Sequence, residues 1–206
     1  MYWVVLAVSA IGAFVLARYL VRPRFEAWRR ARALPARFVV VDVRATGPSP
    51  AKHELLGIAA IRVTPGRADH PYFRGLVRSG KPVPRKAAEA ARVTQQMIDS
   101  DGRPASEVLR SFIEFAGADR LVFYDAASQL AFLHPPDDPD AAPIENPVSD
   151  LRDMARRAWP ARGSFKLRDL ARSVGTEPAQ RNHPLNDCSM IATVYVEAVL
   201  ALKRLD

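Results

Sequence analysis

The sequence contains a single cysteine, Cys188, among 206 residues. One thiol excludes an internal disulfide framework and is consistent with a reducing compartment. Because no local Cys/His signature surrounds it, Cys188 is expected to be a small residue at which a helix packs, and not a nucleophile. Histidine is also scarce, with four residues in all. Three of them, His53, His70 and His134, lack the spacing of metal ligands and are expected at the surface.

Excess positive charge is nearly absent from most of the chain. The formal net charge is +8, yet residues 1–37 hold seven arginines against one glutamate, a net of +6. The remaining residues hold 23 basic and 21 acidic side chains, a net of +2. The pI near 10.1 therefore does not indicate a nucleic-acid footprint on the folded part. With 49% apolar and 25% charged residues, that part is expected to be an ordinary globular domain.

The first 21 residues form the longest apolar run of the sequence. Between Tyr2 and Val21 the only charge is Arg18, and about 20 helical residues cover roughly 30 Å, the thickness of a bilayer core. A cleaved signal peptide would carry its positive charge before such a run, and a buried core helix would not be followed by an arginine cluster. Residues 1–21 are therefore predicted to be a transmembrane anchor, and residues 22–36 a basic juxtamembrane linker that keeps the following domain in the cytoplasm.

From Phe38 onward the hydrophobic pattern predicts one α/β domain with a mixed sheet, residues 37–206, without internal repeats. Asp125 is expected to cap the helix that follows it, and Glu54 to lie on a solvated strand edge. The expected strands are residues 38–43, 54–63, 72–79 and 120–125. The expected helices are residues 84–99, 104–117, 148–158, 165–174 and 187–204, with a surface loop at 134–147.

Four motifs in this order resemble those of a known family. They are VDVRATG at 41–47, VTQQMI at 93–98, LVFYDAASQLAFL at 121–133 and FKLRDLARSVGTEPAQRNHPLNDCSMIATVYV at 165–196. The sequence resembles the DEDDh 3′–5′ exonucleases, the RNase H-like family of the proofreading epsilon subunits of bacterial DNA polymerase III. The resemblance implies an RNase H-like mixed sheet flanked by helices. It also implies an ancestral chemistry in which four carboxylates hold two Mg²⁺ or Mn²⁺ ions and a histidine serves as general base.

Few of the positions that match the family site keep its residue types. Asp42 matches the first aspartate and Asp187 the last. Arg44 stands in place of the glutamate, Gln129 in place of the second-motif aspartate, and Asn182 in place of the histidine. The resemblance therefore implies that three of the five functional positions have been replaced.

The remaining charges do not favour a metal ion. Asp42, Asp187 and Arg44 carry a net charge of −1, whereas Mg²⁺ needs oxygen ligands and negative charge to offset its dehydration. Arginine does not deprotonate at any useful pH. Because residues two apart on a strand share a face, Arg44 is not expected to point away from Asp42. The hypothesis is that Arg44 lies between Asp42 and Asp187 as an internal cation, so that no catalytic residue, metal or other cofactor is expected.

Two rescues of activity stay open at this point. A one-residue slip would bring His183 into the histidine position, and Asp125, one turn before Gln129, could supply a ligand. Thr46 and Gly47, which in the family help to seat the terminal nucleotide, are both present.

The favoured interpretation is a pseudo-exonuclease that serves as a binding or scaffolding module. It would be anchored in a bacterial inner membrane by one pass, with weak, salt-sensitive binding of single-stranded nucleic acid and an unidentified protein partner. The alternative is an active 3′–5′ exonuclease that uses Mg²⁺ or Mn²⁺ in an atypical site. A third interpretation is a purely structural partner of another inner-membrane protein.

Overall fold

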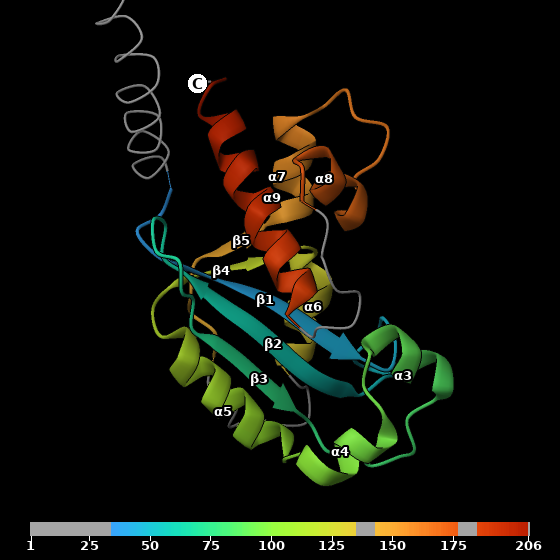
Figure 1. The fold of residues 1–206 in the computed structure, drawn as a ribbon. Helices are drawn as coiled ribbons and strands as arrows, with labels where there is room; N and C mark the ends of the chain where they lie inside the picture. The colour runs from blue at the N-terminus through green and yellow to red at the C-terminus, as the bar shows by residue number, and fades with distance from the viewer. Residues whose placement is uncertain (1–33, 135–142, 177–184, 206) are drawn as a thin grey trace, which may run out of the picture.

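A computed structural model describes residues 34–134, 143–176 and 185–205 (Figure 1). Five strands form one mixed sheet in the order β3-β2-β1-β4-β5. β1 pairs antiparallel with β2, and β2 with β3, while β4 and β5 run parallel to β1. The strands are β1 (Phe38–Ala45), β2 (Leu55–Val63), β3 (Tyr72–Leu76), β4 (Arg120–Phe123) and β5 (Val148–Asp150). The expected mixed α/β sheet is confirmed.

Helices cover both faces of this sheet. Figure 1 shows α9 crossing one face at β1, with α7 and α8 beside it, and α5 running along the sheet near β3. Two short helices, α3 and α4, lie at the far end of β2 and β3. The helices are α3 (Arg85–Ala91), α4 (Gln95–Asp101), α5 (Ala105–Ala116), α6 (Ala126–Leu133), α7 (Leu151–Ala158), α8 (Leu167–Ser173) and α9 (Asn186–Leu202).

The apolar run at the start of β1 forms the centre of the molecule. Phe38 and Val40 face α7, α8 and α9, while Val39 and Val41 face α5 and α6. All four side chains are fully buried. At about 1.5–3 kcal/mol for each large buried side chain, this segment stabilises both layers at once. A continuous apolar strand between two helical layers is what the sequence predicts here.

The helix expected at 84–99 is wrong as a single element. α3 ends at Ala91, the next residue, Arg92, adopts a left-handed conformation with φ of 54°, and a new helix begins after Thr94. The Thr94 side chain accepts a hydrogen bond from the Met97 backbone N–H at 3.1 Å. The VTQQMI motif is therefore a helix start, because a threonine N-cap satisfies a donor that the helix leaves unpaired.

A second correction concerns residues 148–158, which begin as strand β5 and become helical only at Leu151. Asp150, at this transition, accepts hydrogen bonds from the Asp153 N–H at 3.0 Å and from the Ala126 N–H at 2.7 Å. One carboxylate thus serves the starts of both α7 and α6. Asp125 precedes α6 but makes no capping hydrogen bond, so its predicted capping role is wrong. β3 and β4 are also shorter than expected, since they end at 76 and 123.

The predicted anchor at residues 1–21 lies outside the described residues, as does the linker up to residue 33. Within residues 34–134, 143–176 and 185–205, no helix is long and apolar enough to cross a membrane. The anchor and the domain boundaries stay predictions.

Candidate functional site

The candidate site lies where the end of β1 meets the first turn of α9. β1 carries Asp42 and Arg44 two residues apart, on the strand face that is turned toward α9. Asp187 belongs to the first turn of α9, and the next residue, Cys188, packs on β2 with its Sγ 3.4 Å from the Ala59 carbonyl oxygen. This packing of α9 across β1 and β2 brings residues 145 positions apart in sequence, Asp42 and Asp187, to one site.

Arg44 lies between the two carboxylates. Its Nε is 2.5 Å from Asp42 Oδ2, and its Nη2 is 2.5 Å from Asp187 Oδ2. Its Nη1 donates to the Ala90 carbonyl oxygen at 3.4 Å. The Asp187 contact is a hydrogen-bonded ion pair, whereas the Asp42 contact is an ion pair with poor hydrogen-bond alignment. The side chains of Asp42, Arg44 and Asp187 are 14%, 15% and 19% exposed, so solvent weakens these attractions little.

Burial and neighbouring charge act against each other on Asp42. Burial raises the pKa of Asp42 to about 6; the Arg44 charge opposes this rise and the Asp187 charge adds to it. Burial alone would lower the pKa of Arg44, but Asp42 and Asp187 outweigh that effect and raise it. The guanidinium therefore stays charged, and it is the centre around which the two carboxylates are arranged.

Gln129 of α6 supports the backbone of β1. Its Oε1 accepts a hydrogen bond from the Val43 N–H at 3.0 Å. The pairing of β1 with β4 extends only to Val40 opposite Val122, so this N–H lies beyond the neighbouring strand. A buried donor without an acceptor costs free energy, and the glutamine side chain takes the place of the missing strand partner. Gln129 therefore has a structural role in this site.

The turn after β1 is closed by its own residues. The Thr46 Oγ1 accepts from the Glu54 N–H at 2.9 Å, and the Thr46 N–H donates to the Glu54 carbonyl oxygen at 2.9 Å. At Gly47 a Cβ would lie 2.2 Å from His53 Cδ2, so the imidazole ring fills the space that a side chain would need. The nucleotide-seating roles of Thr46 and Gly47 stay predictions.

His53 and Glu54, expected at the surface and on a solvated strand edge, are half-buried. The His53 Nδ1 lies 3.0 Å from the Ser49 carbonyl oxygen, and the Glu54 Oε2 accepts from the Ser79 hydroxyl at 2.6 Å. Together they line a cavity of about 300 Å³ whose apolar wall includes Leu109. Both residues lie in the connection between β1 and β2. Their partial burial depends on contacts with distant residues, which the local sequence does not indicate.

The other chemistry-bearing residues make no ion pair with Arg44, Asp42 or Asp187 in the part of the chain that the structure describes. Asp125 pairs with Arg152 at 2.8 Å, which accounts for its carboxylate without a metal. Cys188 is fully buried and burial raises the pKa of its thiol well above the ordinary value, so its predicted packing role is confirmed. His70 and His134 are exposed, as expected. Asn182 and His183 lie outside the described residues.

The sequence matches the exonuclease family, of the RNase T type, over residues 39–195. The chain belongs to the DEDDh 3′–5′ exonuclease family. It is 27% identical to the DNA polymerase III subunit epsilon of Aquifex aeolicus over 170 residues, which are 82% of this chain and 83% of that protein. It is 28% identical to the PolC-type DNA polymerase III of Clostridium perfringens over 158 residues, 76% of this chain but only 11% of that much longer protein.

Solved exonuclease structures share the fold. The nuclease domain of 3′hExo, a DEDDh family member bound to rAMP, superposes with a TM-score of 0.67 at 17% identity, covering 80% of this chain and 92% of that one. Exonuclease X in complex with 5′ overhanging duplex DNA gives a TM-score of 0.61 at 19% identity, covering 79% and 91%. At these identities the likeness establishes the RNase H-like fold.

The metal chemistry of the DEDDh exonucleases does not fit the residues found here. Within the part of the chain that the structure describes, no group of three or more His, Cys, Asp and Glu side chains could hold a metal ion. Asp42 and Asp187 face a guanidinium at ion-pair distance, and the third position presents an amide bonded to backbone. A dication placed between the two carboxylates would first have to displace Arg44.

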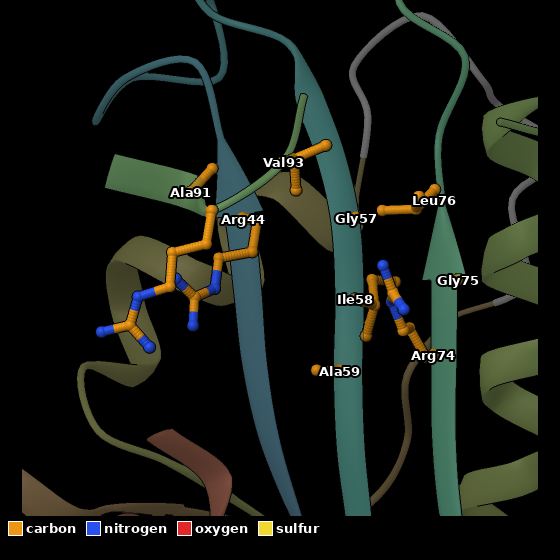
Figure 2. Close-up of a pocket in the computed structure, with 10 residues that line it drawn as sticks. Arg44, Gly57, Ile58, Ala59, Arg74, Gly75, Leu76, Ala91 and Val93 are labelled. Carbon is orange, nitrogen blue, oxygen red and sulfur yellow. The ribbon is translucent and has the colours of Figure 1, made fainter. Parts of the chain in front are cut away.

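Two further arginines near the site were missed by sequence reasoning. Arg92 and Arg74 line, together with Arg44, a small cavity of about 20 Å³. Figure 2 shows Arg44 and Arg74 among the residues around it. Arg92 ends α3, and Arg74 lies on β3 opposite Ala59. Neither position belongs to a family motif, and only the strand register and the turn between α3 and α4 bring them to the site.

Proposed function

We propose that this chain is an exonuclease-like domain that does not hydrolyse nucleic acid and acts as a binding or scaffolding module. The observation that carries the proposal is the ion pairing of Arg44 with both Asp42 and Asp187, the two remaining family carboxylates. A catalytic dication needs these oxygens, and the guanidinium already holds them.

The energetic cost of displacing Arg44 supports this proposal. Breaking a largely buried ion pair by removing one partner costs about 3–5 kcal/mol, because an uncompensated charge is left behind. In this site a metal ion would meet that cost and gain only two carboxylates, since Gln129 Oε1 is occupied by the Val43 N–H. Arg44, Gln129 and Asn182 stand at three of the five positions that match the family site. These replacements also support a loss of hydrolysis.

Nucleic acid is the proposed ligand. Two related folds were solved with a DNA duplex and with rAMP, and this chain keeps the same architecture. The near-neutral domain predicts weak binding that decreases with salt. We further propose that residues 1–21 anchor the chain in a bacterial inner membrane, with the domain in the cytoplasm and a protein partner beside it.

The active alternative rests on the family match over residues 39–195 and on the epsilon relative. It requires Mg²⁺ or Mn²⁺ to bind despite Arg44, with His183 as the base. A nuclease assay separates the two proposals.

The test uses the full-length chain in mild detergent with end-labelled single-stranded DNA and RNA, in Mg²⁺, in Mn²⁺ and in EDTA. We expect the oligonucleotides to stay intact in all three conditions. We also expect the chain to slow their migration in a native gel, and this binding to persist in EDTA. Metal-dependent degradation that the Asp42→Asn variant lacks would instead establish the enzyme. If the oligonucleotides are neither degraded nor bound, the result favours the purely structural role. Calorimetric titration with Mg²⁺ and Mn²⁺ gives an independent check, with no binding expected up to low-millimolar concentration.

A further inference from the structure

A small cavity opens beside the Arg44 ion pairs, and its lining is cationic. Ten residues from β1, β2, β3, the end of α3 and the turn after it surround about 20 Å³, room for a single water-sized group. Three of the ten are arginines, Arg44, Arg74 and Arg92, and none is acidic. Figure 2 shows Arg44 and Arg74 on either side of the strand that carries Ile58 and Ala59.

The charges around this cavity are not balanced. Arg44 is paired with Asp42 and Asp187, whereas the side chains of Arg74 and Arg92 make no ion pair or hydrogen bond with another described residue. The five charged groups sum to +1. Arg92 is close enough to Asp42 for its charge to lower the pKa of that carboxyl. The family site carries a net negative charge that holds cations, whereas the net charge around this cavity is positive.

Strands β2 and β3 approach closely on one side of the cavity. A Cβ on Gly57 would lie 2.7 Å from the Gly75 carbonyl oxygen, so this wall excludes side chains. Arg92 ends α3 in a left-handed conformation, which costs a non-glycine residue roughly 1–2 kcal/mol. This conformation ends the helix, and the Arg92 N–H donates to the Ala88 and Glu89 carbonyl oxygens.

We propose that this pocket, lined by Arg74 and Arg92 and called here the arginine pocket, binds the terminal phosphate of a nucleic-acid strand without a metal ion. The inference rests on the proposed function, because it names the group by which the non-hydrolytic domain holds its ligand. A guanidinium donates a fork of N–H groups that matches phosphate oxygens. One phosphate oxygen fills the water-sized cavity, and the other oxygens lie at its mouth, within reach of the exposed Arg74 and the half-buried Arg92.

The first experiment compares three otherwise identical fluorescent oligonucleotides with the full-length chain in detergent and EDTA. One ends in a 3′-phosphate, one in a 5′-phosphate, and one has hydroxyls at both ends. We expect at least one phosphorylated strand to bind about tenfold more tightly than the hydroxyl strand, the effect of one or two charge-assisted hydrogen bonds. Equal binding of all three strands overturns the arginine pocket but leaves the proposed function intact.

Variants then show which residues cause the preference for a phosphorylated strand. Arg74→Ala and Arg92→Gly should each abolish it, and glycine keeps the left-handed backbone at 92 so that folding is retained. Arg110→Ala is the matched control, because it removes one exposed arginine on α5, which packs on the opposite face of the sheet. Preference that survives both pocket variants, or that is lost equally in the control, contradicts the proposal.

A second measurement separates a strand end from free phosphate. Inorganic phosphate should raise the melting temperature of the chain, and the Arg74→Ala and Arg92→Gly variants should lose this rise while Arg110→Ala keeps it. Stabilisation by inorganic phosphate without preference for a phosphorylated strand would replace the strand end with free phosphate as ligand and overturn the proposal as stated. Metal-dependent degradation in the separate nuclease assay would refute the proposed function. The phosphate-binding measurements could still be interpreted, because the oligonucleotide binding is measured in EDTA.

Discussion

Two ion clusters lie at opposite ends of β1, and the numbers of arginines and aspartates in them are reversed. At the C-terminal end of β1, one arginine, Arg44, lies between two aspartates. At the other end, one aspartate, Asp119, lies between two arginines: its Oδ1 is 2.7 Å from Arg37 Nε and its Oδ2 is 3.1 Å from Arg62 Nε. Asp119 is 8% exposed, while its partners are 55% and 25% exposed.

The two clusters differ in where they lie relative to the residues that the sequence matched to the family site. Arg62 also lies 4.8 Å above the Phe115 ring and donates to the Phe115 carbonyl oxygen. The Asp119 cluster therefore ties β2 to the end of α5, and it corresponds to no residue of the family site. The Arg44 cluster occupies the family site itself. The same kind of interaction joins two elements of the fold at one end, and at the other it holds the two carboxylates that the proposed function withholds from metal ions.

The largest expected effect comes from removing the central arginine. Arg44→Gln leaves Asp42 and Asp187 buried without a cation, so we expect a loss of roughly 3–5 kcal/mol in the free energy of unfolding at pH 7. Uncompensated carboxylates have raised pKa values in the folded state, so this variant should regain stability as the pH falls toward 5. Urea denaturation at the two pH values measures both effects. An unchanged midpoint at pH 7 would show that the cluster contributes nothing to folding.

The second effect is a pH dependence of the unmodified chain. The pKa of Asp42 is about 6 in the folded state against 3.8 ordinarily, so between these values the folded state binds more protons than the unfolded state. The free energy of unfolding should therefore fall as pH rises from about 4 to about 6, by at most about 3 kcal/mol. Asp42→Asn should lack this part of the slope, whereas Asp69→Asn, at an 87% exposed side chain, should retain it. Identical slopes in Asp42→Asn and the unmodified chain would refute the raised pKa.

The opposite cluster gives a smaller effect. Asp119→Asn leaves Arg62 and Arg37 without their carboxylate, but both arginines reach solvent, so we expect a loss of about 2 kcal/mol. Because the family site is untouched, binding of a phosphorylated oligonucleotide should not change. Denaturation and the oligonucleotide assay on the same preparation check the two halves of this prediction. Weakened binding at unchanged stability would contradict the separation of roles.

The sequence predicted the parts of the site that repeat along one element. The apolar run 38–41 and the two-residue spacing of Asp42 and Arg44 place both side chains toward α9, because strand alternation is local. Arg74 and Arg92 could not be found in this way. Arg74 reaches the cavity through the register of β3 on β2, and Arg92 through a left-handed turn inside an otherwise helical pattern.

The capping residue at α6 illustrates the same limit. Asp125 stands at the N-terminal position that propensity favours, yet Asp150, from a neighbouring strand, makes the hydrogen bond to Ala126. Asp125 is instead turned toward Arg152, which lies 4.8 Å from the Tyr124 ring. Two aspartates of equal local propensity are distinguished only by β5, a three-residue strand that the helical pattern of 148–158 concealed. Tertiary placement decided the role of each carboxylate.

The smallest expected effect is on hydrolysis when only the central position is restored. Arg44→Glu returns a carboxylate to β1 but leaves Gln129, whose Oε1 accepts from the Val43 N–H, and Asn182 in place of the family histidine. Without the second-motif carboxylate and the base, we expect no degradation of single-stranded DNA in Mg²⁺ or Mn²⁺, even though three adjacent carboxylates should now bind a dication. A metal-dependent rise in melting temperature would show that the ions are bound. Adding Gln129→Asp and Asn182→His to this variant tests whether the remaining family positions are sufficient. Hydrolysis by Arg44→Glu alone would mean that the arginine is the only barrier to catalysis, and that the cluster at this end of β1 is an inhibited active site.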